Sequence, residues 1–304
     1  MRGAVVRTPL VRLDVEDGPA EIFLKLENMQ PTGSFKVRGA GYAVSHLSKD
    51  ERARGVYTCS AGNMAQALAW HARSYGIPCT VIVPDTAPET KLAGIRRLGA
   101  EIVQVPWDEV WKVATTHRFE PLKDWSFVHP FRDRRMIAGN GTIGLEILED
   151  LPDVDAVVVP FGGGGLAAGI ATAIKRRRPG ARVYACEPET AAPLAASFQS
   201  GTAQTVTRIP SFVDGMGAQS VLPEMWDLVK DLLARSVVVS LREIASAIRL
   251  LVERNRVIAE GAGAAPVAAA LSGKVRGRRV ACVVSGGNID VAKLQTILGG
   301  EVPS

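Results

Sequence analysis

The sequence predicts an α/β fold in which parallel sheets are flanked by helices. From about residue 55 onward, short apolar runs alternate with amphipathic segments of helical length. Several of the apolar runs end in glycine-rich turns, and the run at residues 156–159 is apolar throughout, as in a strand buried on both faces. Such alternation implies right-handed β-α-β crossovers and therefore parallel strand pairing.

The first half of the chain supplies one series of these elements. Residues 1–35 are expected to be extended, with a strand at 21–27, and a helix is expected to begin after Phe35. Gly76 and Gly99 end two of the helices, because glycine readily adopts the left-handed conformation that closes a helix. The predicted strands are 56–59, 79–83, 101–105 and 126–128, and the predicted helices are 64–75, 88–98 and 107–117.

A second series follows, separated by an irregular polar stretch at residues 199–220. We find no internal repeat, low-complexity block or linker. The predicted strands are 156–159, 182–186, 236–239 and 280–284, and the predicted helices are 136–149, 166–177, 241–254, 262–271 and 291–298.

Composition narrows the class of protein. The chain has 304 residues, of which 47% are hydrophobic, and this is enough for one large or two ordinary domains. No apolar run reaches the roughly 20 residues needed to span a membrane, and no secretory segment is recognisable, so we expect a cytoplasmic protein. The net charge of +5 comes without interleaved aromatics, so we expect no nucleic-acid partner. The four cysteines are widely spaced and are expected to be buried thiols.

Three loops that follow predicted strands contain the residues of chemical interest. Gly162, Gly163, Gly164 and Gly165 lie between a buried strand and a helix, where successive backbone N–H groups and the helix dipole suit a phosphate; the alternative is a tight turn. The segment from Ser60 to Asn63 holds either a carboxylate or only a helix cap. Ser285 begins a Gly-Gly turn after the strand at 280–284, at the edge where open α/β sheets place ligands.

A lysine, Lys36, follows Phe35 in the segment 31–40. Lysine is ordinarily a solvated surface charge. Together with the loops, however, the segment resembles a family pattern: the threonine/serine dehydratases and serine racemases of the fold-type II pyridoxal-phosphate enzymes, whose fold is tryptophan synthase β-like. The resemblance lies in residues 24–40 (LKLENMQPTGSFKVRGA), 60–66 (SAGNMAQ), 129–130 (HP), 137–146 (IAGNGTIGLE), 162–166 (GGGGL) and 285–290 (SGGNID).

The resemblance implies pyridoxal 5′-phosphate as the cofactor. Lys36 is then the Schiff-base lysine with Phe35 beside the ring, Asn63 bonds the ring oxygen, and Ser285 faces the pyridine nitrogen. The glycines at 162–165 hold the phosphate, and the substrate carboxylate is held by Ser60, Asn63, Met64 and Ala65. A serine at the ring nitrogen stabilises a pyridinium less than a carboxylate does, which favours loss of a β-substituent over transamination.

Three features depart from the family pattern. Ala61 stands where the racemases have a serine, so racemisation is expected to be poor. Met64 stands where many relatives have histidine; it either makes room for a bulkier substrate or simply packs in a helix. Some relatives bind a divalent cation after a Glu-Pro, and here Glu187 and Ala191 offer only a weak site, since the expected position of the second carboxylate falls near Pro193, which has no side-chain oxygen. We therefore predict no metal beyond that weak candidate.

The resemblance also implies two domains: a large cofactor-binding domain of residues 1–41 plus 135–304, and a small substrate-closing domain of residues 42–134. The expected reaction is dehydration and deamination of an L-3-hydroxy amino acid, most simply threonine or serine, to a 2-oxo acid and ammonia. The alternatives are β-replacement of the cysteine synthase type and dehydration of a bulkier 3-hydroxy amino acid. The expected partners are a small amino-acid substrate and a second copy of the chain in a homodimer.

Overall fold

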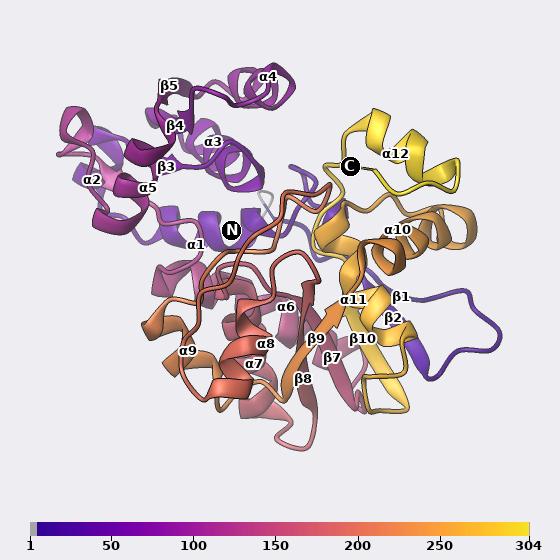
Figure 1. Cartoon of the computed structure of the whole chain (residues 1–304). Helices are drawn as coiled ribbons and strands as arrows, with labels where there is room; N and C mark the ends of the chain where they lie inside the picture. The colour runs from indigo at the N-terminus through magenta and orange to yellow at the C-terminus, as the bar shows by residue number, and fades with distance from the viewer. Residues whose placement is uncertain (1–4, 304) are drawn as a thin grey trace. The chain divides into compact units, whose positions relative to one another are not determined.

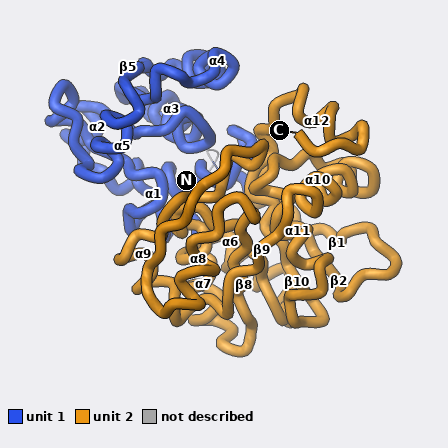
Figure 2. The backbone as a smooth tube through the Cα atoms, viewed as in Figure 1, with its two compact units in different colours: residues 1–6, 30–140 blue, residues 7–29, 141–304 orange. Residues whose placement is uncertain are grey.

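The computed structural model describes residues 5–303, and its chain forms two compact units (Figure 2). Unit 1 comprises residues 1–6 and 30–140, and unit 2 comprises residues 7–29 and 141–304. These bounds differ from the expected division at residues 41 and 134. Helix α1 (Lys36–Ser45) packs against α3 (Asn63–Tyr75), and the Nε2 atom of His71 lies 2.8 Å from the Val37 carbonyl, so α1 belongs to unit 1.

Unit 1 contains a four-stranded, fully parallel sheet with the order β5-β4-β3-β6. Its strands are β3 (Val56–Cys59), β4 (Cys79–Pro84), β5 (Glu101–Val105) and β6 (Ser126–Phe127). Besides α1 and α3, its helices are α2 (Lys49–Arg54), α4 (Glu89–Arg97), α5 (Trp107–Thr116) and the short η2 (Glu120–Leu122).

Strand residues of unit 1 alternate between two cores, because successive side chains of a strand point to opposite faces. Val56 packs with Val37 and Met64, whereas its neighbour Tyr57 packs with Ile82 in a second cluster. Both faces are therefore covered, as expected for a parallel sheet, and the predicted apolar runs of this region are confirmed as strands.

Unit 2 contains a six-stranded sheet with the order β1-β2-β10-β7-β8-β9, in which only the β1–β2 pair is antiparallel (Figure 1). Its strands are β1 (Leu10–Arg12), β2 (Glu21–Lys25), β7 (Ala156–Pro160), β8 (Arg182–Pro188), β9 (Arg235–Val239) and β10 (Arg279–Val283). Its helices are η1 (Glu27–Met29), α7 (Gly165–Arg177), α8 (Pro193–Ser200), α9 (Pro223–Val229), α10 (Leu241–Leu250), the π-turn η3 (Leu251–Asn255), α11 (Gly261–Leu271) and α12 (Val291–Leu298), and α6 (Arg134–Asp150) contains the boundary of the two units.

The alanine-rich helix predicted at 262–271 is α11, and all of its residues but the last are buried. The small side chains let it lie in the interior of unit 2, where it packs against α10 and β7. The four cysteines are buried thiols, as predicted. No helix in residues 5–303 is both long enough and apolar enough to cross a membrane.

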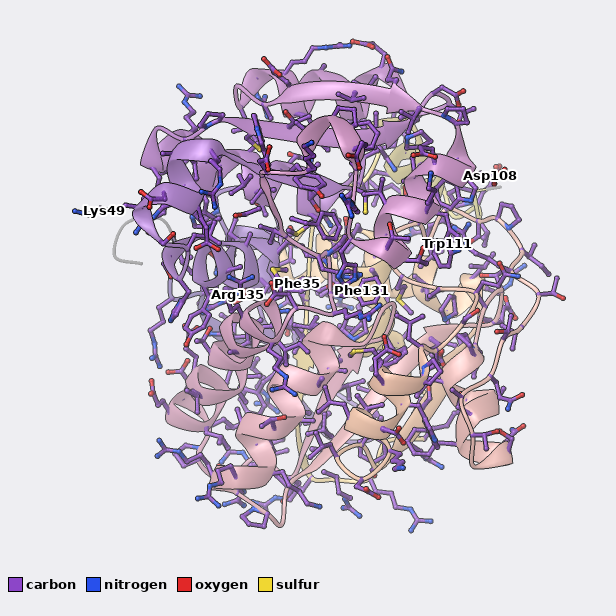
Figure 3. All side chains as sticks on the ribbon, turned by 90° about the vertical axis from the view of Figure 1, so that its left-hand side faces the viewer. Phe35, Lys49, Asp108, Trp111, Phe131 and Arg135 are labelled. Carbon is purple, nitrogen blue, oxygen red and sulfur yellow. The ribbon has the colours of Figure 1, made fainter. Side chains whose placement is uncertain are left out.

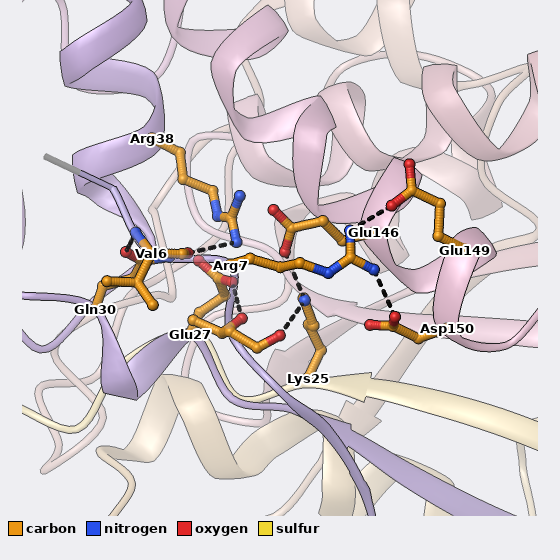
Figure 4. A network of polar contacts seen from close by, with 10 residues as sticks. Val6, Arg7, Lys25, Glu27, Gln30, Arg38, Glu146, Glu149 and Asp150 are labelled. Atoms are coloured by element: carbon orange, nitrogen blue, oxygen red, sulfur yellow. Dashed lines mark hydrogen bonds and ion pairs between the residues drawn. The ribbon is translucent and has the colours of Figure 1, made fainter. Parts of the chain in front are cut away.

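A buried lysine in β2 anchors a polar network of unit 2 (Figure 4). The side chain of Lys25 is fully buried, and its Nζ atom donates to the Thr8 carbonyl and to Glu146 Oε2, both at 2.6 Å. Glu27, also fully buried, accepts a 2.5 Å hydrogen bond from the Thr8 hydroxyl. The positive charge of Lys25 is therefore compensated by the adjacent Glu146 carboxylate, as burial of an ammonium group requires.

Candidate functional site

Lys36 is the first residue of α1 in unit 1, and Phe35 is its N-cap. The Lys36 Nζ atom donates a 2.6 Å hydrogen bond to the Pro130 carbonyl and lies 5.1 Å from the centre of the Phe35 ring. Phe35 precedes Lys36 in the chain and Phe131 follows Pro130, and both aromatic residues are labelled in Figure 3. The half-buried lysine is thus directed to a defined acceptor, unlike an ordinary surface lysine.

In the register of the unit 1 sheet, the loop after β3 lies at the same height along the strands as the Pro130 carbonyl. Tyr57 pairs with Phe127 in the parallel β3–β6 ladder, and three residues further along each chain stand Ser60 and Pro130. The carboxyl ends of parallel strands meet at one edge of a sheet. Ser60 and the Lys36–Pro130 contact therefore belong to the same edge of unit 1.

Neither predicted side chain caps the helix that follows Ser60. The N-cap of α3 is Gly62, which makes no side-chain capping bond, and the Ser60 hydroxyl accepts the Gly62 N–H at 3.2 Å. Asn63, Met64 and Ala65 open the helix, where first-turn N–H groups have no acceptor within the helix itself. An anion such as a carboxylate suits these donors and the adjacent dipole end.

Met64 serves packing. Its side chain is 2% exposed and belongs to the hydrophobic core of unit 1, together with Val37 and Leu68. Only its backbone N–H is left for a ligand. The packing interpretation of Met64 thus has direct support, and the case for a bulkier substrate loses the observation on which it depended.

The predicted phosphate loop in unit 2 has the geometry of an anion cradle. Gly164 is the N-cap of the 13-residue helix α7 and has a φ of 87°, a left-handed conformation that favours glycine. A side chain there would also meet the Phe161 ring and Met225 at 3.1 Å. Gly162, Gly163 and Gly165 complete a turn whose amides precede or begin the first turn of α7. This turn needs its glycines for conformation and for space, and it ends at a positive helix terminus.

Ser285 lies next to this loop in the sheet register of unit 2. Cys282 pairs with Val158 in the parallel β10–β7 ladder, and three residues further along each chain stand Ser285 and Phe161. Ser285 is 2% exposed. The carboxyl ends of β7 and β10 therefore bring a serine and a glycine-rich helix N-terminus to one edge of the sheet.

Helix α11 holds the Ser285 loop in place. The Glu260 N–H donates to the Gly286 carbonyl at 3.0 Å, and a Cβ atom on Gly263 would lie 2.4 Å from the same oxygen. Asp290 caps α12 through a 2.8 Å bond from the Ala292 N–H.

Replacing Gly263 by alanine is expected to displace the Ser285 loop, because the new methyl group would lie 2.4 Å from the carbonyl oxygen of Gly286 and 3.3 Å from its nitrogen. We expect a loss of about 1–3 kcal/mol in the free energy of unfolding, typical of overpacking, and weaker retention of the cofactor. Urea titration and equilibrium dialysis measure the two effects. Gly180→Ala is the matched control, since a Cβ atom there meets nothing within 4 Å. Equal behaviour of the two variants would contradict the expectation.

Glu187 acts as the cap of α8 in this structure. Its carboxylate is buried and accepts 2.8 Å bonds from the N–H groups of Leu194 and Ala195 and a 2.7 Å bond from the Ser236 hydroxyl. Burial raises the pKa of Glu187, and these bonds oppose the increase. Both oxygens are therefore engaged, and residues 5–303 contain no cluster of three or more His, Cys, Asp or Glu arranged for a metal ion.

Two buried histidines of unit 1 make stability depend on pH. Burial lowers the pKa of His71, and burial with the nearby charges of His117 and Arg132 lowers the pKa of His129 to about 3. The unfolded chain binds these protons near pH 6.5 and the folded chain does not. The stabilisation is therefore complete above about pH 6.5 and is lost as the pH falls below it, at up to about 1.4 kcal/mol per pH unit for each histidine, and for His129 the loss continues toward about pH 3.

Urea unfolding between about pH 7 and pH 5 tests this slope. His129→Asn should lower the number of protons taken up on unfolding, and hence the slope, by up to one. The raised pKa of Glu187 gives a slope of opposite sign, and this contribution cancels when the variant and the native protein are compared at equal pH. An unchanged slope in the variant would show that His129 does not titrate as expected.

The residues present fit pyridoxal phosphate within each unit. Unit 1 supplies a directed lysine amine for an aldehyde and, at α3, amide donors for a carboxylate. Unit 2 supplies a glycine cradle at a helix N-terminus for a phosphate and a buried serine for a ring nitrogen. Pro130 was not among the residues expected to act, because a backbone carbonyl has no signature in sequence.

Comparisons with known proteins agree with this set of groups. The family model described as "Pyridoxal-phosphate dependent enzyme" matches residues 1–286. The chain is 45% identical to the L-threonine ammonia-lyase of Thermotoga maritima, over 98% of this chain and 75% of that protein. Its fold is similar to the processed form of threonine deaminase isoform 2 from Solanum lycopersicum (TM-score 0.89, 30% identity, 97% of this chain and 88% of that one). It is also similar to maize serine racemase (TM-score 0.87, 31% identity, 97% and 92%). The chain belongs to the family of pyridoxal-phosphate dependent enzymes.

Proposed function

We propose that this enzyme dehydrates and deaminates L-threonine or L-serine, giving a 2-oxo acid and ammonia. The observation that carries the proposal is the 45% identity to an L-threonine ammonia-lyase across almost the whole chain. The similarity to a threonine deaminase structure supports the same reaction class. In this reaction the substrate loses its α-hydrogen and its β-hydroxyl, and the nitrogen leaves as ammonia after hydrolysis.

The unit 1 residues supply binding and proton transfer. Ser60, Asn63 and the N–H groups of Met64 and Ala65 bind the substrate carboxylate, and Asn63 also bonds the cofactor ring oxygen. Lys36 holds the cofactor until substrate arrives, and its freed amine then takes the α-proton. Phe35 packs beside the ring. An amine directed by the Pro130 carbonyl needs little reorientation to perform this transfer.

The unit 2 residues hold the cofactor. The N–H groups of Gly162, Gly163, Gly164 and Gly165 bind its phosphate, and the Ser285 hydroxyl faces its ring nitrogen. When bound, pyridoxal phosphate supplies the electron-withdrawing ring that makes the α-hydrogen acidic. Because Ser285 is a neutral partner, it stabilises charge at the nitrogen less than a carboxylate would, and this favours expulsion of the β-hydroxyl.

Racemisation is the second candidate, because a serine racemase has nearly the same fold. A racemase needs a second acid on the opposite face of the substrate, and Ala61 has no proton to give. A β-replacement synthase is a third possibility, in which a thiol or sulfide adds where the hydroxyl has left. Elimination needs no acid on that opposite face and no second substrate, so we rank it first.

The test is a joint assay of 2-oxo acid and ammonia on the cofactor-loaded protein. The substrates are L- and D-serine, L-threonine, 3-hydroxyaspartate and phenylserine, with an activated serine plus sulfide as the β-replacement arm. We expect equal amounts of oxo acid and ammonia from L-threonine or L-serine. Oxo acid from none of them, with the cofactor visibly bound, would overturn the proposal, and D-serine formed from L-serine would favour the racemase.

We further propose a cytoplasmic homodimer. The cytoplasmic location rests on the sequence, and the dimer is what the family resemblance implies. Light scattering on the purified protein measures the mass directly, and a mass of one chain at micromolar concentration would contradict the dimer.

A further inference from the structure

We propose that His129 is a positioning residue for Lys36, acting through the peptide group that joins Pro130 and Phe131. The proposal rests on the function proposed above, in which Lys36 works as a free amine during part of the cycle. All the residues involved lie in unit 1, in the turn after β6 and at the start of α1.

The His129 ring is immobilised by its surroundings. It is 3% exposed and lies edge-on to three aromatic rings, with centroids 5.0 Å from His117, 5.8 Å from Phe127 and 4.6 Å from Phe131. A ring so enclosed keeps one orientation, and its nitrogens point in fixed directions.

The ring binds the turn through its Nδ1 atom. This nitrogen accepts the N–H groups of Phe131 at 3.2 Å and Arg132 at 3.1 Å. An atom that accepts two donors carries no proton, so the proton of the neutral ring is on Nε2. The ring thus remains an acceptor as long as it is neutral.

One peptide group contacts both His129 and Lys36. The Phe131 N–H that binds His129 and the Pro130 carbonyl that binds Lys36 belong to the same peptide unit. No peptide bond in residues 5–303 is cis, and in a planar trans peptide the N–H and C=O groups point in opposite directions. Holding the N–H toward His129 therefore holds the carbonyl toward Lys36.

His129 therefore affects Lys36 whenever the lysine amine is not bonded to the cofactor. Without His129, the peptide is able to rotate, and the amine loses the fixed Pro130 carbonyl as an acceptor. Capture of the cofactor aldehyde and transfer of the substrate proton both need the amine in one place. A residue that never touches substrate thereby influences both steps.

Three variants separate this role from simple packing. His129→Asn keeps an acceptor near the position of Nδ1, and His129→Phe keeps an aromatic ring without an acceptor. His46→Phe is the matched control, since His46 is exposed in the same unit. The non-catalytic readout is the rate at which cofactor-free protein captures pyridoxal phosphate on Lys36, trapped by borohydride and located by peptide mass spectrometry.

We expect His129→Phe to slow capture and to lower kcat by about ten- to hundredfold, with KM changed less than about threefold, as for loss of one hydrogen bond to a charged or reacting group. His129→Asn should recover most of both rates, and His46→Phe should match the native protein. Similar losses in the Asn and Phe variants, or none in the Phe variant, would overturn the proposal.

Nitrogen-15 NMR of the native protein provides a test that needs no variant to fold. The chain has four histidines, so the His129 signals are separable. The proposal requires Nδ1 to be unprotonated and Nε2 to be protonated; the reverse would overturn it. The rate of cofactor capture by Lys36 and the tautomer of the His129 ring are both measured without substrate. If the chain proves not to be a dehydratase, these two measurements still decide the role of His129.

Discussion

Replacing Lys36 by alanine is expected to lower turnover by more than about a thousandfold, because the same side chain holds the cofactor and moves the substrate proton. The methyl group of alanine can do neither. The protein should still fold, since Lys36 is half-buried at the first position of α1, where its side chain is not part of the core of unit 1. The measurements are the oxo-acid assay and the visible absorbance of the bound cofactor, with circular dichroism as the check on folding.

Lys49→Ala is the matched control for this experiment. Lys49 also opens a helix of unit 1, α2, but it is fully solvated (Figure 3). We expect its turnover and its borohydride-labelled peptide to match the native protein. If Lys36→Ala retained near-normal dehydration, Lys36 would not be the reacting amine, and the roles proposed for the residues around it would fail with it.

Replacing Lys25 by methionine should produce the largest loss of stability among the single changes considered. Methionine fills a similar volume, but it removes the ammonium group that pairs with Glu146 and donates to the Thr8 carbonyl. Removing one partner of a buried ion pair costs about 3–5 kcal/mol, because the remaining carboxylate loses a charge that compensated its desolvation. Urea unfolding gives the change in free energy.

The double variant Lys25→Met with Glu146→Gln tests the cause of that loss. With the charge of Glu146 also removed, part of the lost stability should return, giving a coupling energy of about 1 kcal/mol or more. Arg7→Ala is a suitable comparison, since Arg7 pairs with Glu149 and Asp150 at the exposed end of the same network and should change stability by less than about 1 kcal/mol. Additive effects of the two substitutions at positions 25 and 146 would mean that the pair does not act as a unit.

The sequence predicted the elements that local patterns determine. Short apolar runs, one of them apolar throughout, located the parallel strands, and glycine clusters located the loops at their carboxyl ends. The left-handed φ of Gly164 is the physical reason that the glycine pattern was informative. Lys36 became a candidate only through the joint family pattern, because an isolated lysine is most often a surface charge.

What escaped prediction depends on partners that are distant in sequence. Lys25 was part of an amphipathic strand in the sequence, and its burial depends on Glu146, which lies 121 residues away. Glu187 had the sequence context of a weak cation site, and its donors come from α8 and β9. The short helices α2, α8 and α9 have little apolar periodicity, and the helix predicted at 241–254 ends as a π-turn from Leu251. In each case the fold decides which partner a residue has.

The strand order of unit 2 has a consequence for how the chain folds. Strand β10 lies between β2 and β7, so the sheet remains in two pieces until a segment near the end of the chain is added. Strand β10 is synthesised more than two hundred residues after β2, whereas the strands of unit 1 all lie between Val56 and Phe127. Closing so long a loop is slow, and it leaves the edge of β2 uncovered meanwhile. On the ribosome, the sheet of unit 1 is therefore expected to form first, and the nascent chain is most prone to aggregation in the interval before β10 emerges.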